Sequence, residues 1–126
     1  DQNKGVYVLC RTSNTSASYI QDTIFDKVVS LSESMNQYEN IGLVVGATDT
    51  EKMNEVRKTN NLPFLIPGIG AQGGSLKDVI QINNNHAEST LINVSRSIIF
   101  AGDHDSDSIH NAAQDLCNQM RLHFER

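Results

Sequence analysis

Four short apolar runs rich in β-branched residues recur along the chain, and each is followed by a polar turn and a segment with helical periodicity. The runs span residues 6–10, 41–45, 64–66 and 90–94. Because a strand with its crossover helix takes roughly 30 residues, a chain of 126 residues accommodates four such units with no linker between them. The runs are continuously apolar and do not alternate with polar residues, which is typical of parallel strands covered on their faces. The sequence therefore predicts an α/β fold.

The helical segments carry apolar stripes and capping residues that predict how each helix is oriented. The stripe expected to pack on the sheet after the first strand comprises Ile20, Ile24, Val28 and Leu31. After the second strand, residues 48–51 have the spacing of a capping box, and we expect Arg57 on the solvated side of the helix that follows. Ser16 is expected to cap the first helix and the acidic run 103–107 the last one, whose apolar stripe should pack on the core, while Ser75 directly precedes the third helix.

The composition excludes several classes of function. The chain has 15 acidic against 10 basic residues and a net charge of -5, so we expect no nucleic acid partner. No apolar run approaches the ~18 residues of a membrane span, and the first residues lack a signal-peptide pattern, which predicts a soluble, cytoplasmic protein with no membrane partner. Cys10 and Cys117 are expected to be reduced, buried thiols. The histidines show no spacing typical of a metal site.

The loops that follow the four strands are where we expect a ligand, because parallel α/β sheets bind ligands at the carboxyl ends of their strands. The third of these loops, residues 67–74, holds half of the eight glycines of the chain. Glycines permit positive φ and close approach of the backbone, so that a nest of amides can hold an anion. Arg96 follows the next strand and could offer a bidentate fork to the same anion. The two adjacent loops together predict a phosphate site.

Residues 68–73 also match the G-x-G-x-x-G pattern of dinucleotide-binding folds. In those folds the pattern follows the first strand and an acidic residue follows the next, whereas here Ser95 and Arg96 follow the next strand. Arginine there would argue for a phosphorylated ribose, so an NADP-dependent oxidoreductase stays open. A barrel instead binds phosphate after strands seven and eight, and the third and fourth loops take those places if the four units are the second half of a barrel.

Four segments in family order, residues 9–14, 44–48, 67–74 and 93–98, resemble the carboxyl-terminal half of orotidine 5'-phosphate decarboxylase. The third of them, Pro-Gly-Ile-Gly-Ala-Gln-Gly-Gly, is a specific signature, and the resemblance covers the whole chain. It implies four βα units that form strands five to eight of a TIM-type (β/α)8 barrel, with 1–126 as half of a single barrel domain and no separate second domain. It also implies a homodimer that converts orotidine 5'-monophosphate to uridine 5'-monophosphate in de novo pyrimidine synthesis, with no metal or organic cofactor.

The same resemblance implies which residues contact the nucleotide base. Ser13 aligns with a serine that hydrogen-bonds the amide edge of the pyrimidine through its hydroxyl and backbone. Pro67 and Ile69 align with the start of a loop that closes on the nucleotide and lines its apolar side. Gln72 aligns with a glutamine that reaches from this loop to the phosphate and the base.

For the phosphate, the resemblance implies binding by Arg96 and by the peptide groups of Ser95 and Arg96. Many members of the family have glycine immediately before this arginine. Ser95 in that place leaves open whether the backbone approaches the phosphate as closely.

The chain has no counterpart of the family's catalytic groups, an Asp and Lys array on the earlier strands with a last aspartate from the partner subunit. No Asp-x-Lys-x-x-Asp occurs, and the lysines lie outside the expected strand ends. We therefore expect no catalytic residue here, and an amino-terminal half of the barrel as partner, because four open units would leave two unpaired sheet edges. The alternatives are another phosphate-binding barrel, an NADP-dependent oxidoreductase, or a non-catalytic phosphate-binding half-barrel.

Overall fold

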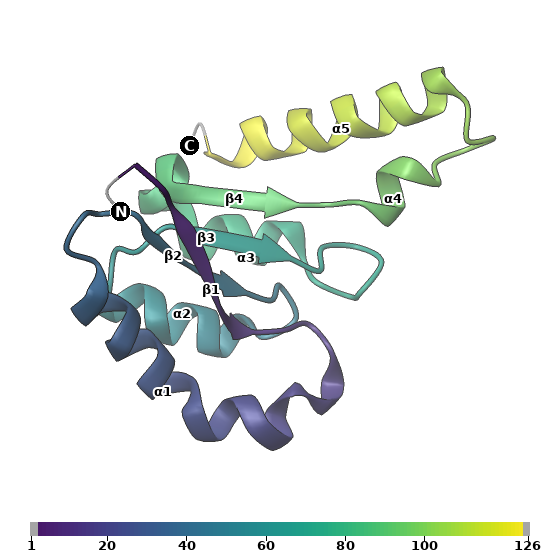
Figure 1. The fold of residues 1–126 in the computed structure, drawn as a ribbon. Coiled ribbons are helices and arrows are strands. Elements are labelled where there is room, and N and C mark those ends of the chain that lie inside the picture. Colours follow the sequence, from purple (N-terminus) through teal and green to yellow (C-terminus); the bar gives the residue numbers. More distant parts are fainter. Residues whose placement is uncertain (1–2, 125–126) are drawn as a thin grey trace.

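A computed structural model describes residues 3–124 of the chain, and its strands and helices alternate as the sequence predicts (Figure 1). In chain order the elements are β1 (Val6–Arg11), η1 (Thr15–Ala17), α1 (Ser18–Met35), β2 (Ile41–Val45), α2 (Thr50–Thr59), β3 (Phe64–Pro67), α3 (Leu76–Asn83), η2 (Asn84–Ser89), β4 (Thr90–Asn93), α4 (Arg96–Ile99) and α5 (Ser106–Phe124).

The four strands form one parallel sheet in the order β1-β2-β3-β4. Each strand pairs with the strand of the preceding unit; Leu43 of β2, for example, lies opposite Phe64 of β3. The expectation of an α/β fold with a parallel sheet is confirmed. Because all strands run in the same direction, their carboxyl ends lie at one edge of the sheet, and the four loops predicted to bind a ligand start there.

The hydrophobic core lies on one face of the sheet only. Leu43 and Phe64 point from the strands into a fully buried cluster, where they meet Phe25 of α1, Met53 of α2 and Val79 of α3. On the opposite face the side chains are uncovered; Leu9 is 56% exposed and Leu91 54%. The continuous apolar runs predicted cover on both faces, but within residues 3–124 helices cover one.

Helix α1 presents a different face to the sheet from the one its apolar spacing predicts. Its buried residues are Phe25, Val29 and Ser32. Of the predicted stripe, Val28 packs partly buried against the core, whereas Ile20 is 69% exposed and Leu31 59%. At about 100° per residue, the predicted stripe is centred nearly a third of a turn from the buried face, on the side away from α2. The helix thus carries two apolar faces, and the sequence pattern alone did not show which one packs on this sheet.

The structure of helix α2 differs from two further expectations, the position of its cap and the exposure of Arg57. Asp49 caps it, with its side chain accepting a hydrogen bond from the Lys52 backbone N–H, so the cap falls one residue after the start of the expected capping box. Arg57 is not on the solvated side: it is 6% exposed, and its guanidinium lies 3.5 Å from the centre of the Phe64 ring. Sequence spacing assigned this residue to the surface because a buried arginine without a carboxylate is uncommon.

The last helix and the cysteines differ in part from expectation. Ser75, which directly precedes α3, caps that helix, and Asp105 accepts a hydrogen bond from the Ser108 N–H at the start of α5, which confirms an acidic cap. The expectation of Ser16 as the cap of α1 is wrong, because it lies within η1 and Ala17 takes the N-cap position. The apolar stripe of α5 is half-buried against α3 and α4, and none of its described residues is fully buried. Cys10 is a buried thiol, but Cys117 on α5 is exposed, so the expectation of two buried thiols is wrong for Cys117.

Candidate functional site

A cavity of about 760 Å³ opens at the carboxyl ends of β1, β2 and β3. Its walls come from the loops after these strands and from the uncovered face of the sheet. The lining residues are Leu9, Arg11, Thr12, Ser13, Asn14, Val44, Thr48, Asp49, Pro67 and Gln72. Three of the residues predicted to bind the base, Ser13, Pro67 and Gln72, are therefore brought together, although they lie far apart in the sequence.

Ser13 is held tightly between the loops that follow β2 and β3. Its hydroxyl donates a hydrogen bond to the Pro67 carbonyl at 3.1 Å, and its own carbonyl accepts one from the Thr48 hydroxyl at 3.1 Å. A Cβ built on Gly46 or on Gly68 would lie 2.7 Å or 2.2 Å from the Ser13 hydroxyl oxygen. Glycine at these two positions is what allows the three loops to come together around Ser13.

The glycine-rich loop after β3 is ordered by its own hydrogen bonds. Gly68, Gly70 and Gly73 have positive φ angles of 99°, 69° and 92°, which side chains disfavour. The N–H groups of Gly70, Gly73 and Gly74 donate to carbonyls within the loop. Because these three amides are already engaged, the loop is not the open nest that its glycine content predicts, and a phosphate would have to use other donors.

A second cavity of about 160 Å³ lies between this loop and the loop after β4. It is lined by Pro67, Gly68, Ile69, Ala71, Gln72, Asn93, Val94, Ser95 and Arg96. Pro67 and Gln72 line both cavities, so the two spaces adjoin. Ile69 is 8% exposed and belongs to the hydrophobic core, so it contributes packing more than open surface. All six predicted binding residues lie on one or both cavities.

Ser95 and Arg96 begin the short helix α4 beside the smaller cavity. The Ser95 carbonyl accepts hydrogen bonds from the N–H groups of Ile98 and Ile99. Because the first N–H groups of a helix have no acceptor within it, those of Arg96 and Ser97 have no backbone partner within residues 3–124. The Arg96 side chain is exposed and forms no ion pair with the described part of the chain. Ser95 has φ -115°, a conformation open to any residue, so the backbone here has no need of glycine.

Two charged residues of the larger cavity were not singled out from the sequence. Arg11 is 8% exposed, and its Nε and Nη2 atoms lie 2.9 Å and 2.8 Å from Asp49 Oδ2. Its Nη1 atom lies 2.8 Å from Asp22 Oδ1, outside good hydrogen-bond alignment. These partners come from α1 and from the loop before α2, a pairing that linear spacing does not reveal. The polar end of β1 was the one available signal.

The described titratable side chains outside the two cavities give no sign of a metal site or an activated thiol. Within residues 3–124 no three His, Cys, Asp or Glu side chains are grouped closely enough to hold a metal ion. Burial, with a smaller contribution from Asp26, raises the pKa of the Cys10 thiol to about 11, so this thiol is protonated at neutral pH. Over the same residues no helix has the length and apolar character of a bilayer span.

The family model and the sequence relatives that match this chain all concern one protein family. Residues 1–108 match the family model described as orotidine 5'-phosphate decarboxylase / HUMPS family. The chain is 41% identical over 118 residues to an orotidine 5'-phosphate decarboxylase from Halorubrum lacusprofundi, covering 83% of this chain and 43% of that protein. It is 41% identical over 135 residues to the protein of the same name from Natronomonas pharaonis, covering 96% of this chain and 49% of the other.

Solved structures agree with the sequence relatives. The UMP synthase of Leishmania donovani superposes with a TM-score of 0.86 at 36% identity, over 98% of this chain and 28% of that one. An orotidine 5'-monophosphate decarboxylase from Methanocaldococcus jannaschii, solved with the inhibitor BMP, gives a TM-score of 0.76 at 25% identity, over 94% of this chain and 50% of that one. The chain thus spans about half the length of the curated relatives it matches.

Proposed function

The chain belongs to the orotidine 5'-phosphate decarboxylase / HUMPS family, and from this premise we propose that it is the nucleotide-binding half of an orotidine 5'-phosphate decarboxylase. The reaction would release carbon dioxide from orotidine 5'-monophosphate and leave uridine 5'-monophosphate, a step of pyrimidine synthesis. The observation that carries the proposal is the pair of adjoining cavities that share Pro67 and Gln72. A nucleoside monophosphate also has two parts, a base and a phosphate, that need different surroundings.

The smaller cavity suits the phosphate. Arg96 is exposed beside it and has no competing carboxylate in the described chain, so its guanidinium is free to take two phosphate oxygens. The N–H groups of Arg96 and Ser97 at the start of α4 add donors of the kind that bind anions. Gln72, on the boundary of the two cavities, is placed to contact both the phosphate and the base.

The larger cavity suits the pyrimidine. Leu9, Val44 and Pro67 give it apolar walls, and Ser13 supplies polar groups. Because the Ser13 hydroxyl donates its proton to the Pro67 carbonyl, its oxygen faces a ligand as an acceptor. An acceptor beside a backbone donor matches the amide edge of a pyrimidine, which offers one N–H and one carbonyl.

The uncovered surfaces support an amino-terminal half of a (β/α)8 barrel as the partner of this chain. Strands β1 and β4 are both edges of the sheet, and an open parallel sheet with unpaired edges is unusual in a finished fold. Residues Leu9 and Leu91 are exposed on the face that would fill the barrel interior. The exposed residues of the predicted α1 stripe, Ile20, Ile24 and Leu31, lie on the β1 side, where the helix of a preceding βα unit would pack.

Catalytic groups would come from that other half. No lysine of the described chain lines either cavity, and Asp49, the single acidic residue on the larger one, is paired with Arg11. The part played by this chain is to bind the phosphate and the base, so that binding energy far from the reacting carboxylate stabilises the transition state and excludes water. A homodimer stays a prediction of the family resemblance, and a cytoplasmic location stays a prediction of the sequence pattern.

Ligand titration of the intact protein that contains this chain tests the proposal. We expect uridine 5'-monophosphate to bind in preference to NADPH, and orotidine 5'-monophosphate to be decarboxylated. Arg96→Ala should weaken phosphate-bearing ligands by about 1.5 to 3 kcal/mol, the usual value of a hydrogen bond to a charged group, and should leave uridine nearly unaffected. Preference for NADPH would favour the oxidoreductase instead, and equal losses for nucleotide and nucleoside would make Arg96 a structural residue.

A further inference from the structure

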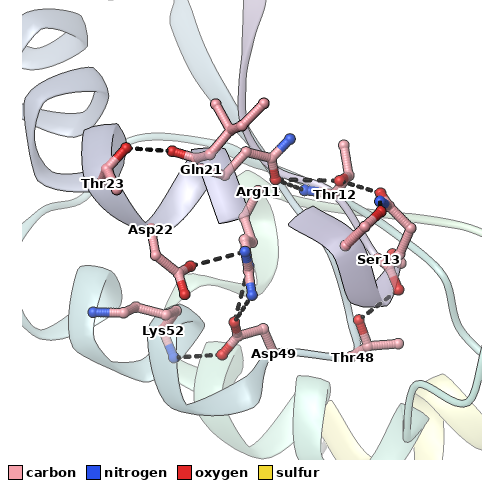
Figure 2. Close-up of polar contacts among 12 residues, drawn as sticks. Arg11, Thr12, Ser13, Gln21, Asp22, Thr23, Thr48, Asp49 and Lys52 are labelled. Carbon is pink, nitrogen blue, oxygen red and sulfur yellow. Dashed lines mark hydrogen bonds and ion pairs between the residues drawn. The ribbon is translucent and has the colours of Figure 1, made fainter. Parts of the chain in front are cut away.

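The loop that carries Ser13 is anchored to two helices by a polar network around Arg11 (Figure 2). Arg11 ends β1, and its guanidinium lies between Asp22 of α1 and Asp49 at the start of α2. The next residue, Thr12, donates its backbone N–H to the Gln21 side chain of α1 at 2.8 Å. The two residues before Ser13 are therefore tied to both helices that flank the strand.

Asp49 connects this network to the fold in a second way. One of its oxygens accepts from Arg11, and the other accepts from the Lys52 backbone N–H at 3.1 Å, which caps α2 (Figure 2). The carboxylate thus fixes the end of β1 relative to the first turn of α2.

Thr48 completes the path to Ser13. It precedes Asp49 in the same loop, and its hydroxyl donates to the Ser13 carbonyl at 3.1 Å. Because Asp49 is held by Arg11 and by the helix, Thr48 has a fixed position from which to hold Ser13. The Ser13 hydroxyl is in turn oriented by Pro67, so backbone and side chain of this residue are both restrained.

Arg11 also lines the larger cavity, but its guanidinium is already paired with two carboxylates of its own chain. A ligand phosphate or carboxylate would have to compete with these carboxylates, since Nε donates to Asp49, Nη2 pairs with the same carboxylate, and Nη1 pairs with Asp22. We propose that Arg11 and Asp49 are positioning residues, which act through Thr48 to hold Ser13 in the geometry that recognises the base. The identity of that base rests on the proposed function.

Two variants of the intact protein test this inference, with uridine 5'-monophosphate and ribose 5-phosphate as probes in calorimetric titrations. Thr48→Val removes one neutral hydrogen bond at an exposed position, and we expect about fivefold weaker binding of uridine 5'-monophosphate. Asp49→Asn keeps an acceptable helix cap but weakens the ion pair, and we expect about a tenfold loss. Binding of ribose 5-phosphate, which has no base, should be unchanged in both.

A matched control and a double-variant cycle separate positioning from general destabilisation. Thr59→Val removes a similar bond, from an exposed threonine hydroxyl to the Val56 carbonyl, and should leave both affinities unchanged. In a Ser13→Ala background the losses caused by Thr48→Val and Asp49→Asn should largely disappear, because contacting residues that act together are not additive. Equal losses for the two probes, or losses that persist in full without the Ser13 hydroxyl, would overturn the proposal.

Amide hydrogen exchange tests the same network without any ligand. Asp49→Asn should accelerate exchange in residues 12–14 more than in the centre of α2. Unchanged exchange in residues 12–14 would contradict the positioning role, whatever the protein binds. If the parent protein instead bound no uridine 5'-monophosphate while exchange responded as expected, the proposed function would fail and the positioning network would stand.

Discussion

The buried contact between Arg57 and Asn83 provides a quantitative test of how β3, and with it the glycine-rich loop, is held in place. Arg57 donates from Nε to Asn83 Oδ1 at 2.9 Å and from Nη1 to the Leu62 carbonyl at 2.9 Å. Asn83 is completely buried, and burial lowers the pKa of the Arg57 guanidinium from its ordinary value to about 10. The cation is therefore stabilised by neutral acceptors and by the Phe64 ring.

Asn83→Leu removes the acceptor while keeping the number and branching of the side-chain heavy atoms. The lost bond joins a charged donor to a buried acceptor, which is worth about 1.5 to 3 kcal/mol. The Asn83 amide also donates to the Val79 carbonyl at 2.8 Å, so we expect a total loss of about 2 to 4 kcal/mol of unfolding free energy. In an Arg57→Met background no charge is left stranded, so the same change should cost about 1.5 to 3 kcal/mol less.

Urea unfolding of the four proteins in this cycle, at pH 7 and constant ionic strength, measures the coupling energy. The exposed pair of Lys52 and Glu55, which lie 2.7 Å apart, is the matched control. Its cycle of Lys52→Met and Glu55→Gln should couple by no more than about 0.5 kcal/mol. The reasoning is refuted if the buried cycle is additive to within the same margin, because the guanidinium would then be compensated by something other than Asn83.

Three further outcomes follow from the same structure. Gly68→Ala should destabilise the protein and abolish base binding, because the added Cβ would overlap the Ser13 hydroxyl. Gly73→Ala, whose Cβ would lie in open space, should cost only about 1–2 kcal/mol of backbone strain. Chemical denaturation and ligand titration of the two variants compare these effects. A thiol reagent should modify Cys117 in the native protein and Cys10, buried and with its pKa raised to about 11, only after unfolding. Asp105 accepts hydrogen bonds at the start of α5, and these lower the pKa of its carboxyl below 3.8. The ionised carboxylate therefore stabilises the folded protein above that pH, and the stabilisation is lost as the pH falls through the lower pKa of the native state. The decrease in thermal stability caused by Asp105→Ala should accordingly vanish in strong acid.

The candidate site divides into a part that local sequence predicted and a part that it missed. Arg96 was found because it directly follows an apolar run, and parallel strands end at one edge of a sheet; Ser13 and Gln72 were found because the short motifs that hold them resemble a known family. Arg11 and Asp49 were missed because their pairing spans 38 positions. Charge alone does not reveal which partner a side chain meets when the partner is distant in sequence.

Local sequence determined the alternation of strands and helices in this protein, since hydrophobic periodicity and caps act over a few residues. The same reasoning could not choose between the two apolar faces of α1, and it assigned Arg57 to solvent. Only the tertiary structure decided that Phe25 and Val29 meet the sheet while Ile20 and Leu31 stay uncovered. The physical reason is that burial depends on which surfaces the sheet and the neighbouring helices present, and that is a property of the assembled chain.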